Sequence, residues 1–339
     1  TSHALTVKGG IKNTGTLTAN ASTIIITGEI AGFAFDQMGT FNAGTSTLQI
    51  GDGSTSTVGS STHFKSNNCH NLIINQHQDA PNGNVLWRAY TGTEVTIGGN
   101  LTVTRGKFIR NTFTLDLTVT GDVDVASVGQ LGREEETGSN TFGSLSVASG
   151  GTYVATSGTT TITTGGTIGG TSDTAFGGEG TFTHNNGTLV LDSVLHRIPR
   201  GGTFYNLKLT GSHNTGGVYL FSDTMLPQAV MPDGTTHAHY FAVLGTLEIT
   251  NDEFRPYNAD KLFVNNLIIG DGTGSSGSAK LDMSEADQFD GKMFVNNVTI
   301  HSDGKFMFGN NDETSATEGS SALNIYGSFR NLGGQVTLE

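Results

Sequence analysis

The amino-acid sequence predicts an all-β protein whose chain winds as a parallel β-helix, or β-solenoid, with irregular insertions between the coils. Its composition, a period-two alternation and repeated sequence templates all point to this fold. Of 339 residues, 49 are glycine, 5 are proline and only 14% are charged. A helical protein of this length carries far more Glu, Lys, Leu and Ala. Tandem β-sandwich modules are the alternative, because short strands with turn signals describe them too.

Apolar residues two positions apart recur along the chain, which is the spacing of a strand with one buried face. Threonine occupies many of the intervening positions and is a good strand former. Glycine or Asn-Gly follows most of these segments, which indicates turns. The clearest examples begin at Leu5, Leu101, Leu117 and Leu247.

The segments also repeat one another. One template, Leu-x-Val-x-Gly-x-Ile or a close variant, begins at Leu5, Leu117 and Leu323. A second, Phe-x-x-Asn-Leu or close to it, begins at Phe204, Phe263 and Phe294, with degenerate copies at Cys69 and Phe142. A third places Phe41 before Leu48 and Ile50, and Phe182 before Leu189 and Leu191.

Repeated templates indicate an array in which each unit buries its apolar side on its neighbours. The copies fall at irregular intervals, which favours coils of a β-solenoid whose turns accept insertions. Aliphatic side chains would then stack inside from coil to coil. An asparagine at a corner would form an amide ladder with the asparagine of the next coil. A sandwich needs no such templates, so we favour the β-helix.

The coils are predicted to fall into N-terminal coils over residues 1–194, coils with a long inserted loop over 195–260, and C-terminal coils over 261–339. The loop is expected at about 212–240, where the rung pattern stops, and residues 195–260 hold four of the five prolines. Residues 128–140, with Arg133-Glu134-Glu135-Glu136, are expected to form a solvated loop. The last coil, ending Val336-Thr337-Leu338, is expected to continue into further sequence or to contact another chain.

Charge and processing signals narrow the function classes. The formal net charge is −13, which would repel a phosphate backbone, so nucleic acid is not an expected partner. No apolar run reaches the length of about 18 residues that a membrane span needs. There is no signal-peptide leader, and the start at Thr1 without methionine suggests processing or a piece of a longer chain. Cys69 alone cannot build a disulfide scaffold.

Several segments resemble repeats in known proteins: "GTFYNLKLTG", "KLFVNNLIIGDG", "GGNLTVTRGKF" and "FTHNNGTLVLDS". They look like repeats of virion fibre and structural proteins of marine tailed phages, and of large secreted bacterial surface proteins and adhesins. The likeness covers most of residues 40–339. The resemblance implies a parallel β-helix, a virion or extracellular location, and homo-oligomers, which in phage fibres are often trimers. It implies no catalytic residue.

The strongest enzymatic alternative is a glycan depolymerase resembling a tailspike. Glycoside hydrolysis needs two carboxylates about 5 to 10 Å apart, one of them with a raised pKa. Asp282 and Glu285 can face one groove, but so can any pair of acids on adjacent coils. Solvation in turn-like stretches explains the acids equally well, and a single tryptophan, Trp87, weakens a sugar-stacking groove. The candidate acids are Asp252, Glu253, Asp282, Glu285, Asp287 and Asp290.

Histidine offers a weaker site. His237 and His239 would lie on one face of a strand, about 7 Å apart, which is compatible with a shared metal. Asp233 is near in sequence, but no third ligand has a telling spacing. We therefore expect no metal site there.

Two Asp-Gly turns, at Asp52 and Asp271, could supply oxygen ligands for calcium. They lack a calcium-loop pattern and are more simply tight turns. Cys69 has only His70 as a basic neighbour and is expected to fill the core. No nucleophile elbow or phosphate loop is present. The sequence predicts no catalytic residue, no cofactor and no metal.

The function we expect is that of a non-enzymatic structural shaft or appendage, most simply a phage fibre or tail component. Its expected partners are further copies of itself, other virion or surface proteins, and a host-surface glycan as a further candidate. The alternatives are an adhesin or receptor-binding module that uses residues 212–240, and the depolymerase.

Overall fold

The computed structural model describes residues 3–54, 61–76, 83–164, 166–168, 171–174, 176–192, 196–199, 202–211, 218–221, 240–256, 261–275, 278–283, 292–308 and 322–338. These residues form strands and turns, and none of them is helical. No helix among them is long and apolar enough to cross a membrane. The chain divides into two compact units, Thr1–Thr160 and Thr161–Glu339, and β17 (Thr159–Ile162) contains the boundary.

The first unit contains β1 (Ala4–Val7), β2 (Ile11–Asn13), β3 (Thr16–Thr18), β4 (Thr23–Ile26), β5 (Phe33–Gln37), β6 (Thr40–Asn42), β7 (Thr47–Ile50), β8 (Ser61–Lys65), β9 (Asn68–Cys69), β10 (Asn71–Asn75), β11 (Asn84–Arg88), β12 (Glu94–Ile97), β13 (Leu101–Arg110), β14 (Asp116–Leu131), β15 (Asn140–Val147) and β16 (Thr152–Val154).

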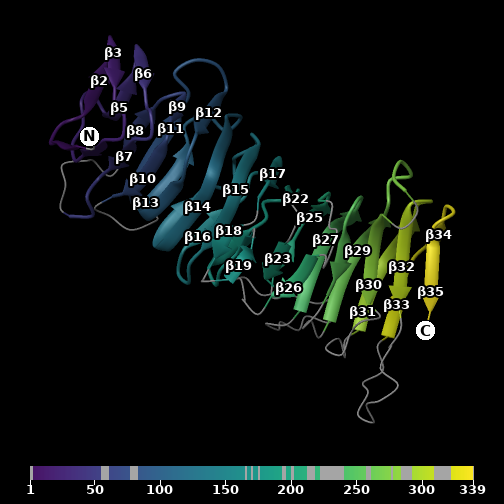
Figure 1. Cartoon of the computed structure of the whole chain (residues 1–339). Coiled ribbons are helices and arrows are strands. Elements are labelled where there is room, and N and C mark those ends of the chain that lie inside the picture. The colour runs from purple at the N-terminus through teal and green to yellow at the C-terminus, as the bar shows by residue number, and fades with distance from the viewer. Residues whose placement is uncertain are drawn as a thin grey trace. The chain divides into compact units, whose positions relative to one another are not determined.

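These strands pair in parallel ladders, which Figure 1 shows as rows of neighbouring arrows. The first ladder joins β1, β4, β7 and β10, then parts of β13, β14 and β15. A second ladder joins β2, β5, β8 and β11, then the later parts of β13 and β14, and β16. A third joins β3 to β6, and another set joins β9, β12, β14 and β15. The predicted parallel β-helix is therefore confirmed.

The interior of the first unit is built by the predicted alternation of side chains. Along the first ladder, Ile24, Leu48 and Leu72 are buried and lie directly opposite one another on successive strands. Along the second ladder, aromatic rings continue the core. The ring centroids of Phe64 and Phe108 are 6.3 Å apart, and Trp87 stacks on Phe108 at 5.7 Å. Each coil thus buries its apolar face on the next.

The second unit contains β18 (Gly166–Ile168), β19 (Thr171–Thr174), β20 (Phe176–Gly177), β21 (Thr181–Thr183), β22 (Thr188–Leu191), β23 (His196–Pro199), β24 (Thr203–Phe204), β25 (Asn206–Leu209), β26 (Val218–Phe221), β27 (Tyr240–Ile249), β28 (Glu253–Arg255), β29 (Lys261–Ile269), β30 (Ala279–Met283), β31 (Lys292–Ile300), β32 (Gly304–Phe308), β33 (Ala322–Ile325), β34 (Phe329–Asn331) and β35 (Gln335–Leu338).

Parallel ladders organise this unit as well. One ladder joins β24 to the first halves of β27, β29 and β31, and then to β33. Another joins β22 and β25 to the second halves of the same strands, and then to β34. The last joins β23, β26, β28, β30, β32 and β35. The short hairpin of β18 and β19 is antiparallel.

An aromatic column fills the core of the second unit. The ring of Phe204 lies 5.5 Å from that of Phe182 and 5.4 Å from that of Phe241, and Phe241 lies 5.7 Å from Phe254. All these rings are buried. The third template is borne out in both units, because Phe41 and Phe182 are buried together with the aliphatic residues that follow them.

The predicted ladder of asparagine amides forms in the second unit, whereas corner asparagines of the first unit bind the backbone of the next coil. In the first unit, the Asn71 side-chain oxygen accepts from the backbone N–H of Asn100 (2.9 Å), and the Asn100 side-chain oxygen accepts from that of Asp122 (3.0 Å). In the second unit, the Asn297 amide donates to the Asn266 side-chain oxygen (3.0 Å). The second template therefore marks corners at which one coil binds the next.

These corners also explain Gly121 of the first template, and Gly245 in another strand; a Cβ atom on Gly9 of the same template would meet open space. A Cβ atom on Gly121 would lie 2.1 Å from the side-chain oxygen of Asn100. A Cβ atom on Gly245 would lie 2.3 Å from the corresponding oxygen of Asn206. Glycine is required there because the amide of the preceding coil occupies the space of a side chain.

Part of the predicted domain organisation falls outside the described residues. Within 212–240, residues 218–221 form β26, which continues a parallel ladder, and Tyr240 begins β27. Residues 212–217 and 222–239 are not among those described. The inserted loop and the limits at 194 and 260 stay predictions.

Candidate functional site

The structure brings two of the candidate carboxylates together in the second unit. Glu253 on β28 lies directly opposite Lys280 on β30. The Lys280 ammonium is 2.6 Å from Glu253 Oε1 and 2.6 Å from Asp282 Oδ2. The two carboxyl oxygens therefore share one cation. Glu285, Asp287 and Asp290 lie outside the described residues.

The charged side chains of this cluster are paired with one another. Burial opposes the charge of Lys280, but hydrogen bonds to Asp282 and Glu253 outweigh it, so the pKa of Lys280 is raised. Arg255 Nε also lies 2.9 Å from Glu253 Oε1. The arrangement is that of a charge-compensated ion-pair cluster.

Asp252, next to Glu253 in sequence, forms hydrogen bonds with the backbone beside the same cluster. Its side chain accepts from the backbone N–H of Glu253 (2.6 Å), and its carbonyl accepts from that of Lys280 (2.7 Å). Asp252 is buried. It fixes the start of β28 against β30.

The histidine candidates cannot be placed, because Asp233, His237 and His239 lie outside the described residues. Among the residues that are described, no group of three or more His, Cys, Asp or Glu side chains could hold a metal ion.

The two Asp-Gly turns are tight turns, as predicted. Gly51 and Gly270 both have positive φ (80° and 81°). Asp52 accepts from the backbone N–H of Ser54 at 2.9 Å and from its hydroxyl at 2.6 Å, and these hydrogen bonds lower the pKa of Asp52. Asp271 has the same relation to Thr273. Each of these two carboxylates therefore accepts hydrogen bonds within its own turn.

A residue that the sequence did not reveal completes the second turn. The carboxylate of Asp303 accepts from the backbone N–H groups of Asp271 (3.2 Å), Gly272 (2.8 Å) and Gly274 (3.2 Å). Asp303 is buried and belongs to the following coil. The carboxylate of Asp303 thus accepts hydrogen bonds from the converging backbone N–H groups of the turn, and it holds the turn against the following coil.

Cys69 is buried, as predicted for a residue that fills the core. Burial raises the pKa of its thiol to about 12. The thiolate, which is the reactive form, is therefore not populated at neutral pH.

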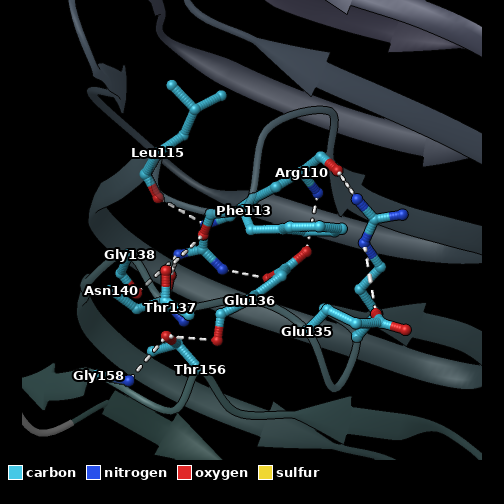
Figure 2. Close-up of polar contacts among 12 residues, drawn as sticks. Arg110, Phe113, Leu115, Glu135, Glu136, Thr137, Gly138, Asn140, Thr156 and Gly158 are labelled. Carbon is cyan, nitrogen blue, oxygen red and sulfur yellow. Dashed lines mark hydrogen bonds and ion pairs between the residues drawn. The ribbon is translucent and has the colours of Figure 1, made fainter.

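A polar network of the first unit surrounds Arg110, which is buried with its guanidinium beside the ring of Trp87. Figure 2 shows the polar contacts around Arg110. Its guanidinium forms an ion pair with Glu136, and its backbone N–H donates to Glu136 Oε1 at 2.8 Å. Arg110 Nε donates to the Leu115 carbonyl (2.6 Å), and the remaining nitrogen donates to the Ser139 carbonyl (3.1 Å) and to Asn140. The buried charge is paired and hydrogen-bonded.

The structure corrects the predicted solvated loop over residues 128–140 at both of its ends and at Glu136. Residues 128–131 belong to β14, and Asn140 begins β15. Glu134 and Glu135 are exposed, as expected, but Glu136 is only 1% exposed. Burial raises the pKa of Glu136, and the attraction of Arg110 opposes this shift. A run of three glutamates looks uniformly solvated in sequence. The partner that buries the last of them lies 26 residues earlier in the chain.

The network extends across further coils. The Asn140 amide donates to the Tyr153 hydroxyl (3.0 Å), which also shares a hydrogen bond with Thr160 (2.8 Å). Burial raises the pKa of Tyr153 to about 12. The Thr156 hydroxyl donates to the backbone carbonyl of Glu136 at 3.1 Å, which Figure 2 also shows. The network ties successive coils together inside the unit.

Among the described residues, the polar clusters of both units thus hold the coils together. Comparison with protein-family models, with curated proteins and with solved structures finds no match to this chain.

Proposed function

We propose that the protein is a non-enzymatic structural component, a shaft or appendage of a phage particle that assembles with further copies of itself and with other particle proteins. The observation that carries this proposal is the parallel ladder of each unit, whose coils repeat the same core and corner contacts. Such ladders resist deformation because every coil is hydrogen-bonded to its neighbours along the axis.

The candidate catalytic pair supports a structural role. Glu253 and Asp282 are both bound to Lys280, and Glu253 also to Arg255. The phage location is supported by the resemblance of the repeats to virion fibre proteins. Most of residues 212–240, on which the adhesin alternative depends, lies outside the described residues. No observation there favours that alternative.

Incubating the protein with envelope polysaccharide of the host is expected to release no reducing ends above background. A matched variant, Glu253→Gln, should give the same background. Immunogold labelling of intact particles, with antibody raised against the chain, should decorate an external appendage. Release of reducing ends by the wild-type chain that Glu253→Gln abolishes would overturn the proposal, as would particles that carry no label.

A further inference from the structure

A short hairpin leads into β5 on the surface of the first unit. Ile30, which is 43% exposed, and Phe33 form an antiparallel bridge, and each donates its backbone N–H to the carbonyl of the other (2.9 and 3.0 Å). Between them, Ala31 and Gly32 both have positive φ (52° and 80°). The left-handed conformation is strained for an alanine, because its Cβ atom crowds the following carbonyl oxygen. We call residues 29–33 the 29–33 hairpin.

His63 and Arg88 hold the 29–33 hairpin against the sheet. His63, on β8, donates its backbone N–H to the Gly32 carbonyl at 3.0 Å. The His63 ring packs on the ring of Phe33, with centroids 5.1 Å apart. The guanidinium of Arg88, on β11, lies over the same Phe33 ring, 4.4 Å from its centroid. The strained hairpin is therefore docked on β8 and β11 through Phe33 and Gly32.

The surroundings of His63 suit a neutral ring. Its Nδ1 atom is buried, and it has no hydrogen-bond partner among the residues that the structure describes. A protonated imidazole carries an N–H donor on both nitrogens, so charging His63 would leave a buried donor unsatisfied. Protonation would also place a second cation beside Arg88, because both side chains pack on the ring of Phe33. Charging His63 therefore opposes docking of the hairpin.

The other charged groups around His63 do not reverse this effect. On β5, Asp36 forms an ion pair with Lys65 of β8 (3.2 Å), so these two charges compensate each other. Glu29, in the hairpin itself, is the acidic group that attracts a charge on His63. Burial and the charge of Arg88 lower the pKa of His63, and the attraction of Glu29 only reduces this shift.

We propose that the 29–33 hairpin is an acid-released element, which stays docked on β8 while His63 is neutral and detaches when His63 is protonated. The docked form is stable above about pH 6.5, the ordinary pKa of histidine, and it loses stability as the pH falls through the lowered pKa of docked His63. Release would relieve the strain at Ala31 and expose Phe33 beside Ile30. The inference goes beyond the structural role and does not depend on it.

Hydrogen exchange of the full chain, followed by mass spectrometry at about pH 7.5 and about pH 5, tests the proposal. After correction for intrinsic exchange rates, residues 27–37 and 61–65 should lose protection several-fold at the lower pH. His63→Gln should abolish this response, because glutamine does not titrate. Arg88→Gln should weaken the response and raise the titration midpoint of the His63 ring measured by NMR, because the repelling cation is gone.

His70→Gln is the matched control, because it removes a histidine between β9 and β10 and should leave the response unchanged. Ala31→Gly should slow opening of the hairpin at both pH values and keep its pH dependence, because glycine adopts positive φ without strain. Circular dichroism should show the folded signature for every variant. Equal protection at the two pH values overturns the proposal, as does a response that His63→Gln retains or that His70→Gln abolishes. None of these results alters the labelling expected for the structural role.

Discussion

Replacing Arg110 with leucine is expected to lower the free energy of unfolding of the first unit by about 3–5 kcal/mol. The substitution removes the ion pair and leaves the carboxylate of Glu136 buried without its cation. The carbonyl groups of Leu115 and Ser139 also lose a donor. Urea unfolding followed by the fluorescence of Trp87 measures the loss, since this is the one tryptophan and it lies beside Arg110.

The dependence of this loss on pH identifies its cause. The folded-state pKa of Glu136 is already raised by burial, and removal of Arg110 should raise it further. A carboxyl group with a raised folded pKa favours folding below its unfolded pKa and opposes it above. The deficit of Arg110→Leu should therefore shrink as the pH falls through the raised folded-state pKa of Glu136, and should be smallest below about 4.3, the ordinary pKa of glutamate.

Two further variants serve as controls for Arg110. Glu135→Gln removes the charge of an exposed neighbour of Glu136; the Glu135 side chain is 64% exposed, and the substitution should leave stability within about 0.5 kcal/mol of wild type. The double variant Arg110→Leu/Glu136→Leu should recover much of the loss, because no buried charge is left unpaired. An Arg110→Leu chain as stable as wild type would show that the network contributes little.

Truncation of Phe204 to alanine is expected to destabilise the second unit by about 3–5 kcal/mol. The ring is fully buried between those of Phe182 and Phe241, so its removal leaves a cavity in the aromatic column. Tyr205→Ala is the adjacent control, since Tyr205 is 36% exposed and stacks at 5.9 Å on His184 alone among the described aromatic rings. It should cost about 1 kcal/mol.

Hydrogen exchange of backbone amides in β25 and β27 locates the effect of Phe204→Ala, because the loss should appear as faster exchange there. Equal exchange in the two variants would contradict the placement of Phe204 in the core and Tyr205 outside it.

Much of the fold follows from local repeats in the sequence. Alternation placed Leu48 and Ile50 on one buried face, and the Phe-x-x-Asn template identified corner residues such as Asn297. These features are predictable because each coil repeats the environment of its neighbour. The glycine at position 121 could be assigned to a corner, but its reason, the amide of Asn100, required the structure.

The polar clusters were less predictable because their partners are distant in sequence. Nothing near Glu136 indicates that Arg110 buries it, and nothing near Glu253 indicates that Lys280 holds it together with Asp282. The register of the coils decides these pairs, and irregular insertions hide that register.

Cysteine cross-linking tests the parallel register of the coils most directly. Lys208 and Glu248 are 40 residues apart in sequence, yet they lie opposite each other on β25 and β27. Adjacent strands are about 4.8 Å apart, within the range that a disulfide spans. In the variant Lys208→Cys/Glu248→Cys, mild oxidation should therefore give a disulfide between the two introduced cysteines, detected by mass spectrometry. The variant Lys208→Cys/Thr246→Cys, displaced by two residues along β27, should cross-link far less. Equal cross-linking of the two variants, or none in either, would contradict the parallel β-helix.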